Sequence, residues 1–170
     1  MSDVIRLSYH VHASPVLLFD LARSIDVHKA STHQTGEEAI AGKTSGLLEL
    51  GEAVTWRAQH FGVWQTLASR ITVFDRPHHF RDSMVHGAFK AFDHDHFFTE
   101  LPDGVTLMED VFTYSAPLGP LGWLAERLFL TAYMTRFLNE RNLVVVDLAE
   151  SGRWREYLER SNPEGVNIDL

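Results

Sequence analysis

The stretch GEAVTWRAQHFGVWQTLASRITVFD, which covers residues 51–75, predicts a β-hairpin. Apolar and polar side chains alternate on both sides of Phe61-Gly62, as they do in two half-buried strands that are joined by a tight turn. We therefore expect one strand over residues 52–61 and a second over residues 63–75. Strands that are joined by a two-residue turn run antiparallel.

The position of the turn also decides which side chains face the interior. A two-residue turn places Trp56 opposite Leu67. The face that carries Trp56 is the more apolar of the two, so we expect it to face inward. A slip of one residue would reverse the faces and turn Arg57 and Arg70 inward. The expected inward set comprises Val54, Trp56, Ala58, His60, Gln65, Leu67, Ile71 and Val73.

Further strand-like segments lie before and after the hairpin. Residues 4–11 alternate apolar and polar side chains, and a weaker strand signal covers residues 37–41. Three more runs are divided by turn-forming residues and cover residues 80–89, 92–101 and 105–115. Six or seven strands with short connections favour an antiparallel sheet.

Helical signals lie at both ends of this series of strands. Ser14 followed by Pro15 predicts the start of a helix over residues 15–24, and a second short helix follows to about residue 32. The longest helical pattern covers residues 120–150, with apolar side chains at spacings of three and four. A helix of about thirty residues is roughly 45 Å long, which is enough to cross a small domain.

The length of 170 residues suits a single domain. We assign residues 1–150 to this domain and residues 151–170 to a C-terminal tail, in which GRWREYLERS predicts one or two turns of helix. The net charge of −8 argues against a nucleic-acid partner, because phosphate backbones are bound by clustered basic residues.

The chain contains no cysteine, so it forms no disulfide and no thiolate metal site. No apolar run approaches the roughly 18 residues of a membrane-spanning helix, and the N-terminal sequence MSDVIRLSYHV lacks the pattern of a secretion signal. We therefore predict a cytoplasmic protein with no membrane span.

Strand parity places several polar side chains on the predicted inward faces. The chain has ten histidines, a high number for its length. Buried polar groups are costly unless they are paired, so we expect these side chains to serve a ligand, water or one another. They are His60, His86, His94, His96, Asp82, Asp110 and Tyr114.

Five short motifs accompany this order of elements. They are GEAVTWRA (51–58), FGVWQ (61–65), SRIT (69–72), FDRP (74–77) and APLG (116–119). Over about residues 3–149 the chain resembles the START-like, birch-pollen-allergen-like superfamily, also called SRPBCC. Within it, the motifs are similar to those of a bacterial ligand-binding subfamily that is related to polyketide cyclases, dehydrases and lipid-transport domains.

The resemblance implies an α+β fold of the helix-grip type. In this fold a curved antiparallel sheet of six or seven strands surrounds a long C-terminal helix, and two short helices follow the first strand. The resemblance also implies an apolar cavity between sheet and helix. Members of the superfamily include binders, transporters, cyclases and hydrolases without a single catalytic motif, so the fold carries over and the function does not.

Metal binding is one interpretation of the histidines. His94 and His96 lie two residues apart on one strand and point the same way. Together with His86, His60 and Asp110 they have ligand types that zinc accepts. Histidine–carboxylate pairs in a cavity wall are the simpler explanation, so we predict no metal and no cofactor.

Acid–base chemistry is another interpretation. A histidine with a pKa near neutrality can polarise or deprotonate a bound carbonyl compound. The candidate catalytic residues are His86, His94, His96 and Asp110, and the carboxylates that would orient the histidines are Asp82 and Asp110.

The expected function is binding of a small hydrophobic ligand, aromatic or oxygenated, in an internal cavity. One alternative is an enzyme of the cyclase or dehydratase type that uses the cavity histidines. Another is a protein-interaction module whose outer sheet face carries Trp64 and Phe74, and a homodimer is left open. The expected ligand-binding residues are Trp56, His60, Gln65, Phe80, Met84, His86, Phe92, His94, His96, Phe98, Asp110, Phe112 and Tyr114.

Overall fold

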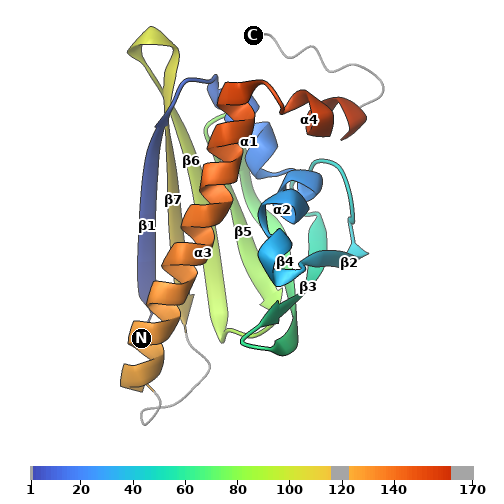
Figure 1. The fold of residues 1–170 in the computed structure, drawn as a ribbon, viewed down its shortest axis with the longest axis vertical. Helices are drawn as coiled ribbons and strands as arrows, with labels where there is room; N and C mark the ends of the chain where they lie inside the picture. Colours follow the sequence, from blue (N-terminus) through green and yellow to red (C-terminus); the bar gives the residue numbers. More distant parts are fainter. Residues whose placement is uncertain (1, 116–122, 162–170) are drawn as a thin grey trace.

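A strongly curved sheet forms one side of the molecule (Figure 1). The computed structural model describes residues 2–115 and 123–161. The strands are β1 (Asp3–Val11), β2 (Glu38–Gly42), β3 (Ala53–His60), β4 (Val63–Asp75), β5 (His79–His86), β6 (Ala91–Leu101) and β7 (Val105–Ser115). These seven strands follow the order β1-β7-β6-β5-β4-β3-β2, and every neighbouring pair is antiparallel. The predicted antiparallel sheet is thus confirmed.

The turn at Phe61-Gly62 joins β3 to β4 as predicted. Both residues have positive φ angles, 53° and 76°, as a type I′ hairpin turn requires. The register pairs Trp56 with Leu67. The predicted faces are confirmed up to Ile71, because Trp56 is buried whereas Arg70 on the opposite face is exposed.

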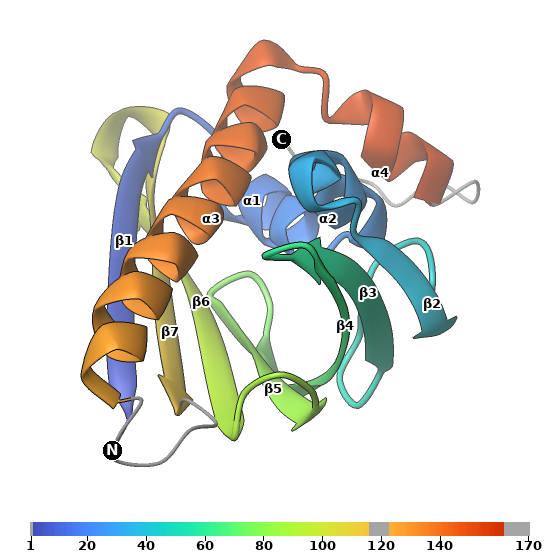
Figure 2. The same cartoon turned by 60° about the horizontal axis from the view of Figure 1, so that its bottom comes forward.

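The described residues form four α-helices, namely α1 (Pro15–Ala22), α2 (Ile25–Ser31), α3 (Trp123–Ser151) and α4 (Arg155–Ser161). Figure 2 shows the sheet curving from β1 to β2 beneath α1, α2 and α3. The two short helices after the first strand and the long C-terminal helix confirm the predicted α+β helix-grip fold.

The short helices begin where side-chain caps satisfy their first backbone donors. The Oγ of Ser14 accepts a hydrogen bond from the Leu17 amide at 3.3 Å, and Pro15 is the first helical residue. The Oγ of Ser24 accepts from the Val27 amide at 3.3 Å in the same way. Both caps fix the entry of the chain into helices whose apolar faces close the concave side of the sheet.

The interior contains two hydrophobic clusters. In the first, Phe19 of α1 makes edge-on ring contacts with Phe80 of β5 and Phe98 of β6, with centroid distances of 5.1 and 5.7 Å. In the second, Phe112 of β7 lies in the same cluster as Met134 of α3. The clusters hold α1 and α3 on the same face of the sheet.

Two predicted inward positions, Val73 and His86, are wrong. The register of β4 shifts between Ile71 and Val73, so Val73 pairs with Arg81. Phe74, predicted on the outer face, therefore turns inward and packs on Phe19 with a ring-centroid distance of 5.2 Å.

His86 lies at the end of β5 and its side chain is exposed. The register between β4 and β5 shifts between Ala68 and Ser69, so the simple alternation that places His86 inward breaks down at this point.

Two further sequence predictions concern the C-terminal part of the chain. The APLG motif, residues 116–119, lies outside the described residues. The tail contributes α4, whose neighbouring Trp154 and internal Leu158 belong to the first hydrophobic cluster.

Among the described helices, none has the length and apolar character that crossing a bilayer demands.

Candidate functional site

Two adjoining cavities lie between the sheet and α3. The larger has a volume of about 290 Å³ and lies near the β3–β4 hairpin and the first half of α3. The smaller has a volume of about 100 Å³ and extends toward α1 and α2. We call them the large and the small chamber. They share the lining residues Glu37, Trp56, Leu67, Phe89, Met134 and Phe137.

The structure brings only part of the predicted ligand-binding set to these chambers. Trp56 lines both of them. His60 and Gln65 line the large chamber. The predicted residues in the wall of the small chamber are Phe80, Phe92, His94 and Phe112.

The remaining predicted residues lie away from the chamber surface. His96, Asp110 and Tyr114 are almost completely buried behind it, and Phe98 belongs to the first hydrophobic cluster. Met84 packs against the second cluster. The exposed His86 lines neither chamber.

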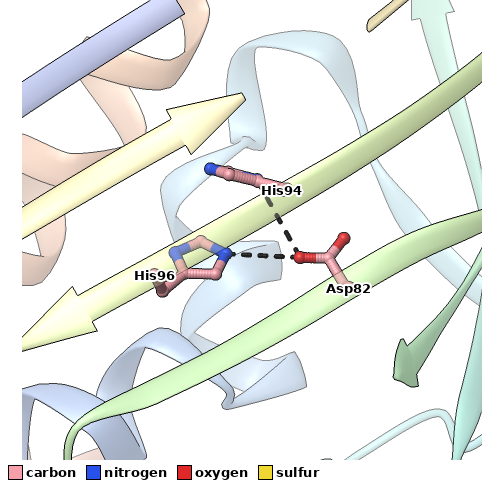
Figure 3. A group of neighbouring side chains, drawn as sticks. All are labelled: Asp82, His94 and His96. Carbon is pink, nitrogen blue, oxygen red and sulfur yellow. Dashed lines mark hydrogen bonds and ion pairs between the residues drawn. The ribbon is translucent and has the colours of Figure 1, made fainter. Parts of the chain in front are cut away.

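A buried group of histidines and carboxylates lies at the small chamber. His94 and His96 project from β6, and Asp82 projects from the neighbouring β5 (Figure 3). The Nε2 of His96 is 3.2 Å from Oδ1 of Asp82, and the Nδ1 of His94 is 3.9 Å from the same oxygen. We call these three residues the His94–His96–Asp82 cluster.

Asp110 of β7 lies behind the cluster and contacts both imidazoles. Its two carboxylate oxygens are 3.2 Å from Nε2 of His94 and 2.8 Å from Nδ1 of His96. Asn142 of α3 donates a hydrogen bond of 2.7 Å to the same carboxylate. Asp110 therefore orients both rings and is itself held by the long helix.

The electrostatics of this group follow from burial and mutual contact. Burial alone would raise the pKa of Asp110, but the charges and hydrogen bonds of His96 and His94 outweigh it and hold that pKa well below its usual range. Burial lowers the pKa of His94, and the neighbouring His96 adds to this effect. Burial also acts to lower the pKa of His96, but Asp110 and Asp82 outweigh it and raise that pKa. His94 therefore favours the neutral form, whereas His96 favours the imidazolium.

A second polar group lies where the two chambers meet. Glu37 lines both chambers, and its Oε2 is 3.1 Å from Nε2 of His28 in α2. The two atoms are close, but the contact lacks hydrogen-bond alignment, and among the described residues neither atom has another hydrogen-bond partner. The ring of His28 stacks on Trp56 with a centroid distance of 4.1 Å.

Burial raises the pKa of Glu37, but His28, Thr32 and the more distant His60 outweigh it and lower that pKa overall. An ionised carboxylate thus stands at the junction of two largely apolar chambers. Such a group is costly to bury and favours a ligand that brings a hydrogen-bond donor to it.

The large chamber has its own polar pair. The Nδ1 of His60 lies 2.6 Å from the hydroxyl of Tyr133 on α3. Burial lowers the pKa of His60, which favours the neutral ring. Phe61 lines this chamber, packs on Tyr133 with a ring-centroid distance of 4.6 Å and is 54% exposed, so aromatic side chains border the outer end of the chamber.

Sequence reasoning missed Glu37, His28 and Asn142. His28 lies in a short helix and Glu37 at the start of the weak strand signal, and neither segment is long enough for its periodicity to mark an inward face. Asn142 did carry a signal, because it lies four residues after Leu138 on the apolar stripe of α3, where a polar residue is out of place unless it has a partner.

Comparison with solved structures supports the fold. TTHA0849 from Thermus thermophilus has 15% sequence identity and a TM-score of 0.72, over 88% of this chain and 99% of that one. A START superfamily protein from Mycobacterium smegmatis has 8% identity and a TM-score of 0.65, over 87% of this chain and 97% of that one.

A plant protein shows the same architecture. Ginseng major latex-like protein 151 from Panax ginseng has 13% identity and a TM-score of 0.61, over 87% of this chain and 97% of that one. A scan against protein-family models and a search of the curated proteins found no match. The chain therefore has the START-like, birch-pollen-allergen-like fold, and identities this low carry the fold alone.

Proposed function

We propose that this protein binds a small, mostly apolar ligand with one or two oxygen atoms in the two chambers. The observation that carries the proposal is the pair of adjoining cavities, whose walls are mainly aliphatic and aromatic with a few polar groups. A wall of this composition matches ligand sites in general, where apolar burial supplies affinity and a few polar groups set orientation.

The size of the chambers limits the ligand to a compact molecule. Burial of roughly 200 Å² of apolar ligand surface would contribute about 5 kcal/mol, at about 25 cal/mol per Å². The flat ring of Trp56 borders both chambers and favours a planar partner. The polar groups at the junction and at the inner wall favour a ligand whose oxygens are separated along its length.

Naphthalene and 2-naphthol, titrated while tryptophan fluorescence is followed, test this proposal. We expect saturable binding of both probes by the unmodified protein. Ala58→Phe should weaken the binding of both by about tenfold or more, because Ala58 is buried in the wall of the large chamber. Arg70→Ala on the outer sheet face is the control and should leave both affinities unchanged.

Substitution of His94 distinguishes a hydrogen bond to the ligand from apolar burial of the ligand. His94→Ala should weaken 2-naphthol more than naphthalene, since His94 lines the small chamber and can contact only the oxygenated probe by a hydrogen bond. Equal loss for both probes would mean that His94 only supports the wall. Absence of saturable binding of either probe would contradict the proposal and favour the protein-interaction module.

Acid–base catalysis of the cyclase or dehydratase type is a second candidate. The observation that favours it is His94, which lines a chamber, has a lowered pKa and is held by Asp110. A neutral imidazole so held is a candidate base for a bound carbonyl compound. Four further expectations stay predictions. They are the relation to bacterial polyketide cyclases and lipid-transport domains, the cytoplasmic location, the lack of a nucleic-acid partner, and the homodimer that the sequence leaves open.

A further inference from the structure

We propose that His94, His96 and Asp82 bind one divalent transition-metal ion at the inner wall of the small chamber. The proposal departs from the sequence-based expectation of no metal. It rests on the geometry of these side chains and does not depend on the proposed organic ligand.

The three donor atoms already lie close to the positions that a metal requires. One ligand atom from each residue can be chosen so that all three lie within 4.8 Å of one another. Bonds of about 2.0–2.1 Å in a tetrahedral site separate neighbouring donors by about 3.3 Å. The separations from Oδ1 of Asp82 are 3.2 Å to Nε2 of His96 and 3.9 Å to Nδ1 of His94, which bracket that spacing.

The outer contacts of the histidines have the form that metal sites use. A metal-bound histidine usually presents one ring nitrogen to the ion and donates the other to a carboxylate. Here Asp110 contacts Nε2 of His94 and Nδ1 of His96, which leaves Nδ1 of His94 and Nε2 of His96 on the side of Asp82. Asn142 fixes Asp110 in turn. One buried carboxylate thus orients both rings toward a common point.

The cluster is open on one side. Asp82 and His94 line the small chamber, so an ion held by three protein ligands would have a coordination position directed at the cavity. Two imidazoles and one carboxylate suit zinc, iron and their first-row neighbours better than calcium or magnesium, which prefer oxygen ligands alone. The ion would offer its open position to an oxygen atom of a molecule in the chamber.

Charged side chains around the His94–His96–Asp82 cluster influence the binding of an ion. Asp82 and Asp110 supply two negative charges, and the Arg141 guanidinium, which also lines the small chamber, supplies a positive one. Without an ion, His96 contacts both carboxylates through its two ring nitrogens. An ion at the cluster takes the position of a proton on Nε2 of His96, so ion and proton compete for that nitrogen. The nearby Arg141 favours an anionic oxygen at the open position.

The test is a titration of the chelator-treated full-length chain with Zn²⁺ by calorimetry at neutral pH, with Co²⁺ absorption as the spectroscopic readout. We expect one ion per chain. His94→Ala and Asp82→Asn should abolish this binding. Asp110→Asn should weaken it about 10–100-fold, which is the typical effect of changing an outer partner of a ligating histidine. His86→Ala removes an exposed histidine and is the matched control, with unchanged affinity.

Circular dichroism of each variant establishes that it is folded, and Asp82→Asn keeps the size of the side chain. The proposal is overturned if the unmodified protein binds no ion, or if folded Asp82→Asn and His94→Ala bind as tightly as the unmodified protein. Loss of binding in His86→Ala alone would point to a surface histidine site and would also overturn it. Because no organic ligand is present, none of these outcomes affects the proposed function.

Discussion

At the scale of single residues, polar groups of this protein are buried in organised sets on both faces of the sheet. The inner face holds the His94–His96–Asp82 cluster with Asp110. The outer face holds Asp95, which is 6% exposed and accepts two hydrogen bonds from Arg81, at 2.8 and 2.9 Å. His79 approaches the same carboxylate at 2.7 Å.

Asp95→Asn should lower the free energy of unfolding by about 1–2 kcal/mol at neutral pH. Hydrogen bonds to a charged group contribute about 1.5–3 kcal/mol, and partial exposure of Arg81 reduces this figure. Urea unfolding of both proteins measures the difference. An unchanged midpoint would show that the Arg81 contact contributes no stability.

The contact between Asp95 and Arg81 also predicts how the free energy of unfolding changes with pH. Burial acts to raise the pKa of Asp95, but Arg81 and His79 outweigh it and lower that pKa below its ordinary value of 3.8. As the pH falls through 3.8, the unfolded chain takes up the proton first. The unmodified protein should therefore exceed Asp95→Asn in free energy of unfolding by the full amount above about pH 5. This difference should shrink below pH 4, as urea titrations at a series of pH values would show.

Strand parity predicted the inward positions of His94, His96 and Asp110, because alternation is strict within a regular strand. It failed for His86, where a register shift interrupts the alternation. It could not find Glu37, because the strand signal over residues 37–41 is too short and weak to assign an inward face. Tertiary folding alone brings that carboxylate to the cavity.

At the scale of elements, the β3–β4 hairpin follows directly from local sequence. Alternation fixes the two strands, and the positive φ angles of Phe61 and Gly62 fix the turn between them. The long helix was predictable for the same reason, since its apolar residues recur over many turns. The chambers between these elements were implied only by the resemblance, because cavity volume depends on packing that periodicity does not describe.

Gly62→Ala should destabilise the protein by about 1 kcal/mol, because Gly62 has a φ of +76° that a Cβ atom disfavours. No heavy atom lies within 4 Å of the position of that Cβ, so the effect comes from the backbone alone. Gly62→Asn should cost less, since asparagine tolerates this conformation. Chemical denaturation of both variants checks the order, and a larger loss for asparagine would contradict the assigned turn.

At the scale of the whole molecule, the segment after α3 belongs to the packed core. Trp154 is 7% exposed and lies in the same hydrophobic cluster as Val27 of α2 and Leu148 of α3. Sequence periodicity ends at this segment, so its packing was not predictable from the long helix alone. The observed contacts place Trp154 and Leu158 in the first hydrophobic cluster.

Trp154→Ala should lower the free energy of unfolding by about 3–5 kcal/mol, the usual cost of removing a buried aromatic side chain. Trp64→Ala is the matched control, because Trp64 is exposed on β4, and its loss should stay within about 1 kcal/mol. Thermal and urea unfolding measure both. Equal losses for the two variants would show that the packing of Trp154 does not stabilise the domain.

The pairing of β1 with β7 has a consequence for biosynthesis. Asp3 pairs with Tyr114 and Val11 with Thr106, so the first strand of this sheet to be synthesised has its partner near the end of the sheet-forming sequence. At about 5–20 residues per second, β1 waits on the order of 5–20 seconds for β7 to be made. During that interval its backbone edge is open to pairing with other nascent chains, which makes the alternating polar residues of β1 an advantage.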